Sequence, residues 1–283
     1  MARRVPLLWL VPLAAAAALS ACSIASRPQR PAWRTEAENV CLAERRVQPS
    51  AYVRMTSELE GPGICGLTRP FKVTALQGGA VAFNATATLD CSMVAELESW
   101  VADVVQPAAQ ARFGQSVTQI NSMGSYSCRS MNNQRGAALS EHSFGNALDI
   151  GGFILADGRV VSILRDWTQG DFAARAFLMD VQRGSCGLFS TVLAPGSNPF
   201  HYNHIHVDLA RHGRSGRHIC SPEPREIDAP SPLVAQAAAP TAEEEDVEPG
   251  EGPPRAAFEG PGVGVREGAL GAYAAPPPPR RDY

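Results

Sequence analysis

The sequence lacks three features that would each define a class of protein. None of its seven cysteines forms a close CxxC pair, which argues against a zinc-thiolate site. A collagen-like or fibrous chain is excluded, and a hydrophobic content of 45% is too high for a chain that is disordered throughout. Lysine is nearly absent, since Lys72 is the only lysine among 25 basic residues, and we attribute this to coding bias rather than to function.

The N-terminal residues have the pattern of a secretory signal. Arg3 and Arg4 precede an apolar stretch, Val5–Leu19, that is too short to span a bilayer comfortably. The residues before Cys22 resemble the bacterial lipobox, in which the cysteine is lipidated and becomes the mature N-terminus. We therefore expect removal of residues 1–21 and attachment to the membrane through lipid on Cys22. The serine that follows favours, by resemblance to sorting patterns, the periplasmic face of the outer membrane.

Composition divides the rest of the chain into three parts. Residues 22–38 are polar and typical of a tether, and residues 39–220 contain the apolar segments of a folded domain. Residues 221–283 hold 13 of the 23 prolines, and 12 acidic residues against 5 basic ones. Because such a segment buries too little apolar surface to fold, we expect a disordered, acidic tail.

Six cysteines remain when Cys22 is assigned to the lipid. An even number in an exported chain predicts three disulfides. We predict the pairing that closes local loops, namely Cys41 with Cys65, Cys91 with Cys128, and Cys186 with Cys220.

Hydrophobic periodicity predicts both strands and helices. Val81–Leu89 alternates as a strand does, and Cys91–Phe113 carries apolar residues at helical spacing. The apolar segments Ala147–Leu155 and Arg159–Leu164 flank Asp157-Gly158, which predicts an antiparallel hairpin.

Two residues are expected to interrupt or end helices. Pro107 should kink or end the first helix, and Gly184 should stop an amphipathic helix over Asp171–Arg183. Short strands and a few long helices in irregular order predict an α+β fold, with a small antiparallel sheet, flanking helices and disulfide cross-links.

All six histidines lie between residues 142 and 218, and three of them fall in the segment His201–Asp208. The flanking apolar residues predict an extended backbone there. The period of two then puts His204, His206 and Asp208 on one face, while Ile205 and Val207 point into the core. Two imidazoles and a carboxylate on one face form a candidate metal or acid/base site.

A second segment, Ser140–Asp149, holds His142 and Asp149 with Gly145-Asn146 between them. We expect His142 on a loop before the glycine and Asp149 on the outgoing strand. Together, His142, Asp149 and one or both of His204 and His206 give two imidazoles, a carboxylate and an open position, the ligand set of a catalytic zinc site.

These segments resemble the LAS metallopeptidases, which include D-Ala-D-Ala carboxypeptidases and murein endopeptidases with the pattern S-x-H-x(6)-D followed by H-x-H. Ser140, His142 and Asp149 match the first part, and His204 with His206 the second. The stretch from Cys41 to Cys220, including Gly124-Ser125-Tyr126-Ser127-Cys128-Arg129, is also similar to the bacterial extensin-like C-terminal domain family. The resemblance implies a fold like that of hedgehog and D-Ala-D-Ala peptidases.

The resemblance also implies roles for single residues. His142, Asp149 and His206 would bind Zn²⁺, and His204 would be catalytic rather than a ligand. An arginine upstream of the first histidine would help to bind substrate or polarise the carbonyl, and of Arg129 and Arg135 we choose Arg129, beside Cys128. Three residues would orient the ligands by hydrogen bonds: Ser140, Tyr126 and Asp208.

The expected function is therefore zinc-dependent hydrolysis of peptide bonds in peptidoglycan. A non-catalytic, metal-containing lipoprotein that binds the cell wall is the alternative. A mononuclear iron oxygenase also uses two histidines and a carboxylate, but usually in a His-x-Asp arrangement. We expect peptidoglycan and membrane lipid as partners, and no nucleic acid.

Overall fold

The computed structural model describes residues 30–213 and 216–227. The predicted signal peptide, Cys22 and most of the predicted tail lie outside these residues. Within the described part of the chain, no helix is long and apolar enough to cross a membrane.

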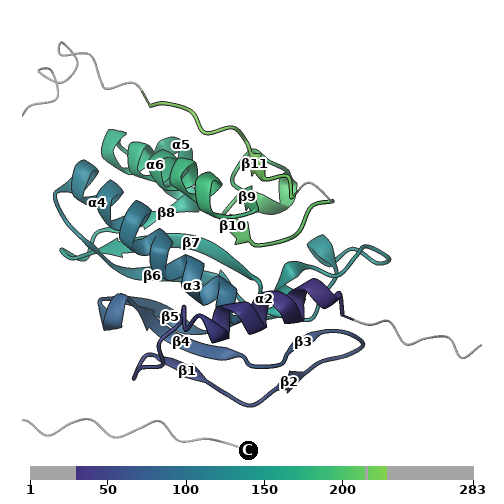
Figure 1. Cartoon of the computed structure of the whole chain (residues 1–283). Coiled ribbons are helices and arrows are strands. Elements are labelled where there is room, and N and C mark those ends of the chain that lie inside the picture. Colours follow the sequence, from purple (N-terminus) through teal and green to yellow (C-terminus); the bar gives the residue numbers. More distant parts are fainter. Residues whose placement is uncertain (1–29, 214–215, 228–283) are drawn as a thin grey trace, which may run out of the picture. The chain divides into compact units, whose positions relative to one another are not determined.

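A mixed sheet of nine strands lies at the centre of the described residues (Figure 1). Its strands run in the order β1-β4-β5-β6-β7-β10-β9-β11, and β8 pairs with β7 beside this path. The bounds are β1 (Val53–Met55), β4 (Phe71–Leu76), β5 (Val81–Leu89), β6 (Val117–Gly124), β7 (Ala147–Leu155), β8 (Val160–Ser162), β9 (Thr191–Leu193), β10 (Ile205–Asp208) and β11 (Ile219–Ser221). A separate antiparallel pair consists of β2 (Leu59–Glu60) and β3 (Gly66–Leu67).

The α+β class is confirmed, but the sheet is larger than predicted and not purely antiparallel. β5 pairs with β6, and β9 with β11, in parallel. The predicted hairpin is present, because β7 and β8 pair antiparallel on either side of Asp157-Gly158.

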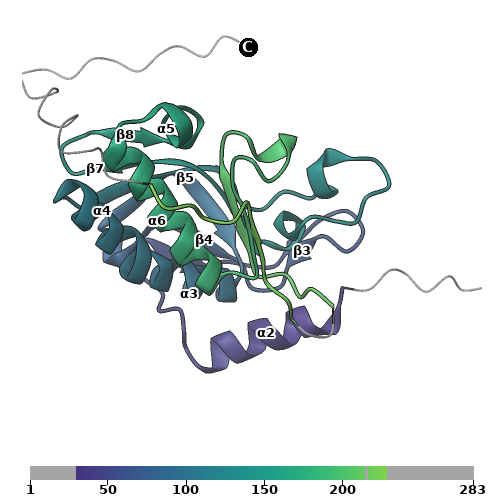
Figure 2. The ribbon, with the colours of Figure 1, turned by 90° about the horizontal axis from the view of Figure 1, so that it is seen from above.

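Helices cover one face of this sheet. Their bounds are α2 (Ala32–Ala43), α3 (Cys91–Trp100), α4 (Gln106–Phe113), α5 (Ile163–Gln169) and α6 (Phe172–Leu188). Figures 1 and 2 show α3, α4 and α6 side by side over the strands. Trp100, Phe153 and Phe177 bring α3, β7 and α6 together in the core, and the indole N–H of Trp100 donates to Ser185 Oγ at 2.9 Å.

Neither predicted helix breaker ends its helix. A π-helical turn over Val101–Val105 joins α3 to α4, so the helical backbone continues past Pro107, which lies in the first turn of α4. Gly184 lies inside α6, and a Cβ there would be 2.4 Å from a methyl carbon of Val104. Gly184 therefore permits close packing of α6 on the π turn.

Two of the three predicted disulfides are wrong. Cys41 pairs with Cys91 and Cys65 with Cys128, whereas Cys186–Cys220 is as predicted. The observed pairs close loops of 50 and 63 residues. Loop length was a poor guide because doubling it adds only about 0.6 kcal/mol to the closure cost. The deciding factor is packing, since α2 lies against α3.

The folded part of the chain begins before residue 39. α2 starts at Ala32, inside the segment interpreted as a tether. Arg34 forms an ion pair with Glu141, and Glu38 is buried and accepts from the backbone N–H of Arg69 at 2.9 Å. The first turns of α2 are thus docked on the domain.

Candidate metal centre

Strand alternation on β7 and β10 separates the core from the polar site. The two strands are antiparallel neighbours, and Asp149 is directly opposite His206. The neighbouring residues Leu148 and Val207 belong to the apolar core. Because successive side chains point to opposite faces, Asp149 and His206 project from the face that is turned away from the core.

A short turn supplies the third residue. His142 lies in a 3₁₀ turn, Glu141–Phe144, and its backbone N–H donates to Ser140 Oγ, which caps the turn. Gly145 ends the turn with φ of 63°, and a Cβ there would lie 2.3 Å from a methyl carbon of Leu67. Only glycine fits this position without displacement. The predicted loop before Gly145 and strand after it are confirmed.

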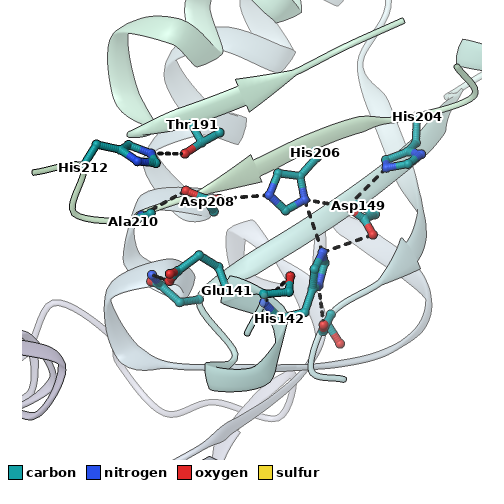
Figure 3. A network of polar contacts seen from close by, with 12 residues as sticks. Glu141, His142, Asp149, Thr191, His204, His206, Asp208, Ala210 and His212 are labelled. Atoms are coloured by element: carbon teal, nitrogen blue, oxygen red, sulfur yellow. Dashed lines mark hydrogen bonds and ion pairs between the residues drawn. The ribbon is translucent and has the colours of Figure 1, made fainter. Parts of the chain in front are cut away.

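The three side chains converge at one point (Figure 3). His142 Nε2 is 3.2 Å from His206 Nδ1 and 3.2 Å from Asp149 Oδ2. His206 Nδ1 is 2.8 Å from Asp149 Oδ1. All three residues are buried, and their facing atoms have the separations expected of ligands to one metal ion.

Hydrogen bonds on the far side of each ring fix which nitrogen carries hydrogen. His142 Nδ1 lies 2.6 Å from the carbonyl oxygen of Ser125, which can only accept, so Nδ1 donates. His206 Nε2 likewise lies 3.0 Å from Asp208 Oδ2. In the neutral rings the facing nitrogens then hold lone pairs directed at each other and at a carboxylate. A positive charge between them makes this arrangement favourable, and either a proton on His206 or a bound metal ion could supply it.

The electrostatics of the site also favour a cation. Burial by itself would lower the pKa of His206, but hydrogen bonds to Asp149 and Asp208 raise it to about 9. Burial would raise the pKa of Asp149, yet hydrogen bonds with His142 and His206 hold it well below its usual range. The carboxylates therefore stay ionised and attract positive charge to the point where the ligand atoms meet.

Two further histidines lie beside the three. His204 Nε2 is 3.5 Å from Asp149 Oδ1, while its Nδ1 contacts Asn203 Oδ1 at 2.9 Å. The His201 ring centre is 5.0 Å from that of His204, and its Nδ1 contacts Asn198 Oδ1 at 2.8 Å. Desolvation lowers the pKa of both rings, that of His201 to about 4, so both are neutral near pH 7.

An open cleft of about 650 Å³ contains these residues. Arg129 lines it, with its guanidinium 3.5 Å from Asp149 Oδ2. The segment around Met131 and the turn around Phe200 contribute further lining, and both of these side chains are about half exposed. The cleft is of a size that accommodates a small ligand or a peptide segment.

The structure brings together most of the residues named from the sequence. Ser140 acts on the backbone of the turn, since its Oγ accepts from the N–H of His142 at 3.4 Å. Tyr126 is placed differently, with its hydroxyl close to Gly61, and among the described residues it makes no hydrogen bond to a ligand. The orienting contact comes instead from the adjacent carbonyl of Ser125, which no side-chain pattern could reveal. The position of His201 was also missed, although its spacing to His204 and His206 was visible.

A family model described as extensin-like protein C-terminus matches residues 39–221. The match covers well over half of the chain, so the chain belongs to this family. Comparisons with curated proteins and with solved structures give no match.

Proposed function

We propose that this member of the extensin-like family is a zinc-dependent peptidase that hydrolyses peptide bonds of peptidoglycan in the cell envelope. The observation that carries the proposal is the meeting of His142 Nε2, His206 Nδ1 and the two carboxylate oxygens of Asp149, at separations of 2.8–3.2 Å.

The donor set suits zinc. Two imidazole nitrogens and one carboxylate are a common three-residue set of catalytic zinc sites, which leave one position for water or substrate. Tetrahedral ligands at about 2.0–2.1 Å from one ion lie about 3.3–3.4 Å apart, and the two separations from His142 Nε2 are 3.2 Å. The backbone carbonyl of Ser125 and the carboxylate of Asp208 on the outer nitrogens are the kind of contacts that orient zinc-bound histidines.

The remaining residues of the cleft have positions suited to hydrolysis. Bound zinc would lower the pKa of a water molecule toward about 7 and polarise a carbonyl. His204 is neutral and its Nε2 faces the ligand cluster, so it can take a proton from the attacking water and pass it to the leaving amine. Arg129 lies within reach of the oxyanion that forms on the substrate carbonyl.

The substrate class rests on the resemblance to LAS peptidases and on the sequence before residue 23. An exported lipoprotein at the periplasmic face of the outer membrane would face peptidoglycan. The cleft is open to solvent, which a cross-linked polymer requires.

The test is turnover of purified muropeptides by the full mature chain loaded with one equivalent of zinc. Mass spectrometry should detect peptide products that carry one added water, and His142→Ala, which removes a metal ligand, should yield none. If the protein binds zinc and sediments together with cell walls but releases no products, it is instead the non-catalytic wall-binding lipoprotein.

A further inference from the structure

The first turn of α2 contacts the turn that carries His142. The Arg34 guanidinium forms two parallel hydrogen bonds with the Glu141 carboxylate, Nη1 to Oε2 at 2.7 Å and Nη2 to Oε1 at 2.5 Å. The Arg34 and Glu141 side chains are only 12% and 14% exposed. A two-pronged contact of this kind fixes direction as well as distance, unlike a single ion pair on the surface.

Two aromatic rings lie against the guanidinium of Arg34. Its central carbon lies 4.3 Å from the ring centre of Trp33 and 4.0 Å from that of Phe144. Trp33 belongs to α2, whereas Phe144 ends the turn that carries His142. The arginine is therefore held by both elements that it connects.

Glu141 links Arg34 to the metal site. It precedes His142 in the chain, and Figure 3 shows the two residues next to each other. The Asn146 side-chain amide donates to Glu141 Oε2 at 2.6 Å, and the Asn146 backbone N–H donates to the Glu141 carbonyl at 3.2 Å. The carboxylate thus joins α2, the turn and the residue before β7.

We propose that Arg34 is a positioning residue for the metal centre, acting on His142 through Glu141. The four-residue turn Glu141–Phe144 has few internal hydrogen bonds, so contacts from outside must set the place of the imidazole. Without Arg34, Glu141 would be a nearly buried carboxylate without its cation, and it would move toward water and carry the turn with it. Arg34 lies before the family match, which starts at residue 39, so the helix interpreted as a tether belongs to the functional unit.

The proposal rests on the proposed metal site, and its test separates the two. Zinc affinity of the full mature chain is measured by competition with a chromophoric chelator, and the visible absorption of the Co²⁺-substituted protein reports ligand geometry. Arg34→Gln should weaken zinc binding about 10–100-fold and change the Co²⁺ spectrum. Arg34→Lys keeps the positive charge but cannot form the two parallel hydrogen bonds with Glu141. It should therefore weaken zinc binding and change the Co²⁺ spectrum less than Arg34→Gln does.

Arg69→Gln is the matched control. Arg69 also joins α2 to the domain, through Asn39 and Glu38, but does not contact the turn of His142. The Arg69→Gln variant should have the zinc affinity and the Co²⁺ spectrum of wild type, even if its melting temperature is lower. If Arg34→Gln proves unfolded, Arg34→Lys decides the question.

Wild-type zinc affinity and spectrum in a folded Arg34 variant would refute the positioning role. Failure of the wild-type protein to bind zinc would refute the metal site itself.

Discussion

Replacement of Asp208 tests how the structure orients the proposed metal ligands. Asp208 Oδ2 accepts the hydrogen of His206 Nε2 at 3.0 Å, and Asp208 Oδ1 accepts from the N–H of Ala210 at 2.9 Å. Burial would raise the pKa of Asp208, but the hydrogen bond with His206 lowers it, so this carboxylate is ionised at neutral pH. Its charge makes His206 Nδ1 a stronger donor of electrons to a metal.

Loss of such a partner typically costs 10- to 100-fold in metal affinity, or about 1.4–2.7 kcal/mol. Asp208→Ala removes both the acceptor and the charge, so its loss of zinc affinity should be close to 100-fold. Asp208→Asn keeps an acceptor oxygen without the charge, and a charge-assisted hydrogen bond is about twice as strong as a neutral one, so its loss should be about 10-fold.

Competition with a chromophoric zinc chelator measures the affinity of each variant. Asp171→Asn is the matched control, because Asp171 caps α6 through the N–H of Ala174 and is not among the residues that line the cleft. Equal zinc affinities for wild type, Asp208→Ala and Asp171→Asn would refute the proposed coupling of Asp208 to the metal.

Three further predictions concern catalysis and stability. His206→Ala should lose stoichiometric zinc, whereas His204→Ala should keep zinc and lose about 10²–10⁴-fold in kcat on muropeptides; loss of zinc from the latter would make His204 a ligand. Burial raises the pKa of Asp90 to about 7 from 3.8, so folding takes up a proton there and its contribution to stability falls as pH rises from about 4 to 7. Asp90→Asn removes this titration, so the free energy of unfolding of the variant minus that of wild type should be more positive at pH 8 than at pH 5, by at most a few kcal/mol. Urea unfolding at both pH values measures this difference, and the same difference at both would contradict the prediction. Removing the Cys41–Cys91 disulfide by double replacement with serine should lower the free energy of unfolding by about 2–5 kcal/mol, and an unchanged urea midpoint would argue against that pairing.

Local signals in the sequence were sufficient for the elements around the site. The bounds of β5 and the Asp157-Gly158 turn depend on short-range periodicity and turn chemistry, and both were predicted correctly. The loop-to-strand change at Gly145 was predicted for the same reason, since a positive φ there requires glycine.

Features set by long-range packing were not predictable in this way. Cys41 pairs with Cys91 because α2 docks on α3, and no spacing rule contains that contact. The low helix propensity of glycine predicted that Gly184 would end the helix. Gly184 instead lies within α6, because the Val104 side chain is too close to leave room for a Cβ. The roles of the Ser125 carbonyl and of Arg34 likewise depend on neighbours far along the chain.

Metal analysis of the full chain, purified without chelators, tests the central claim most directly. The account predicts one zinc per chain in the wild-type protein and none in His142→Ala. Stoichiometric iron in place of zinc, or zinc retained in full by His142→Ala, would contradict it.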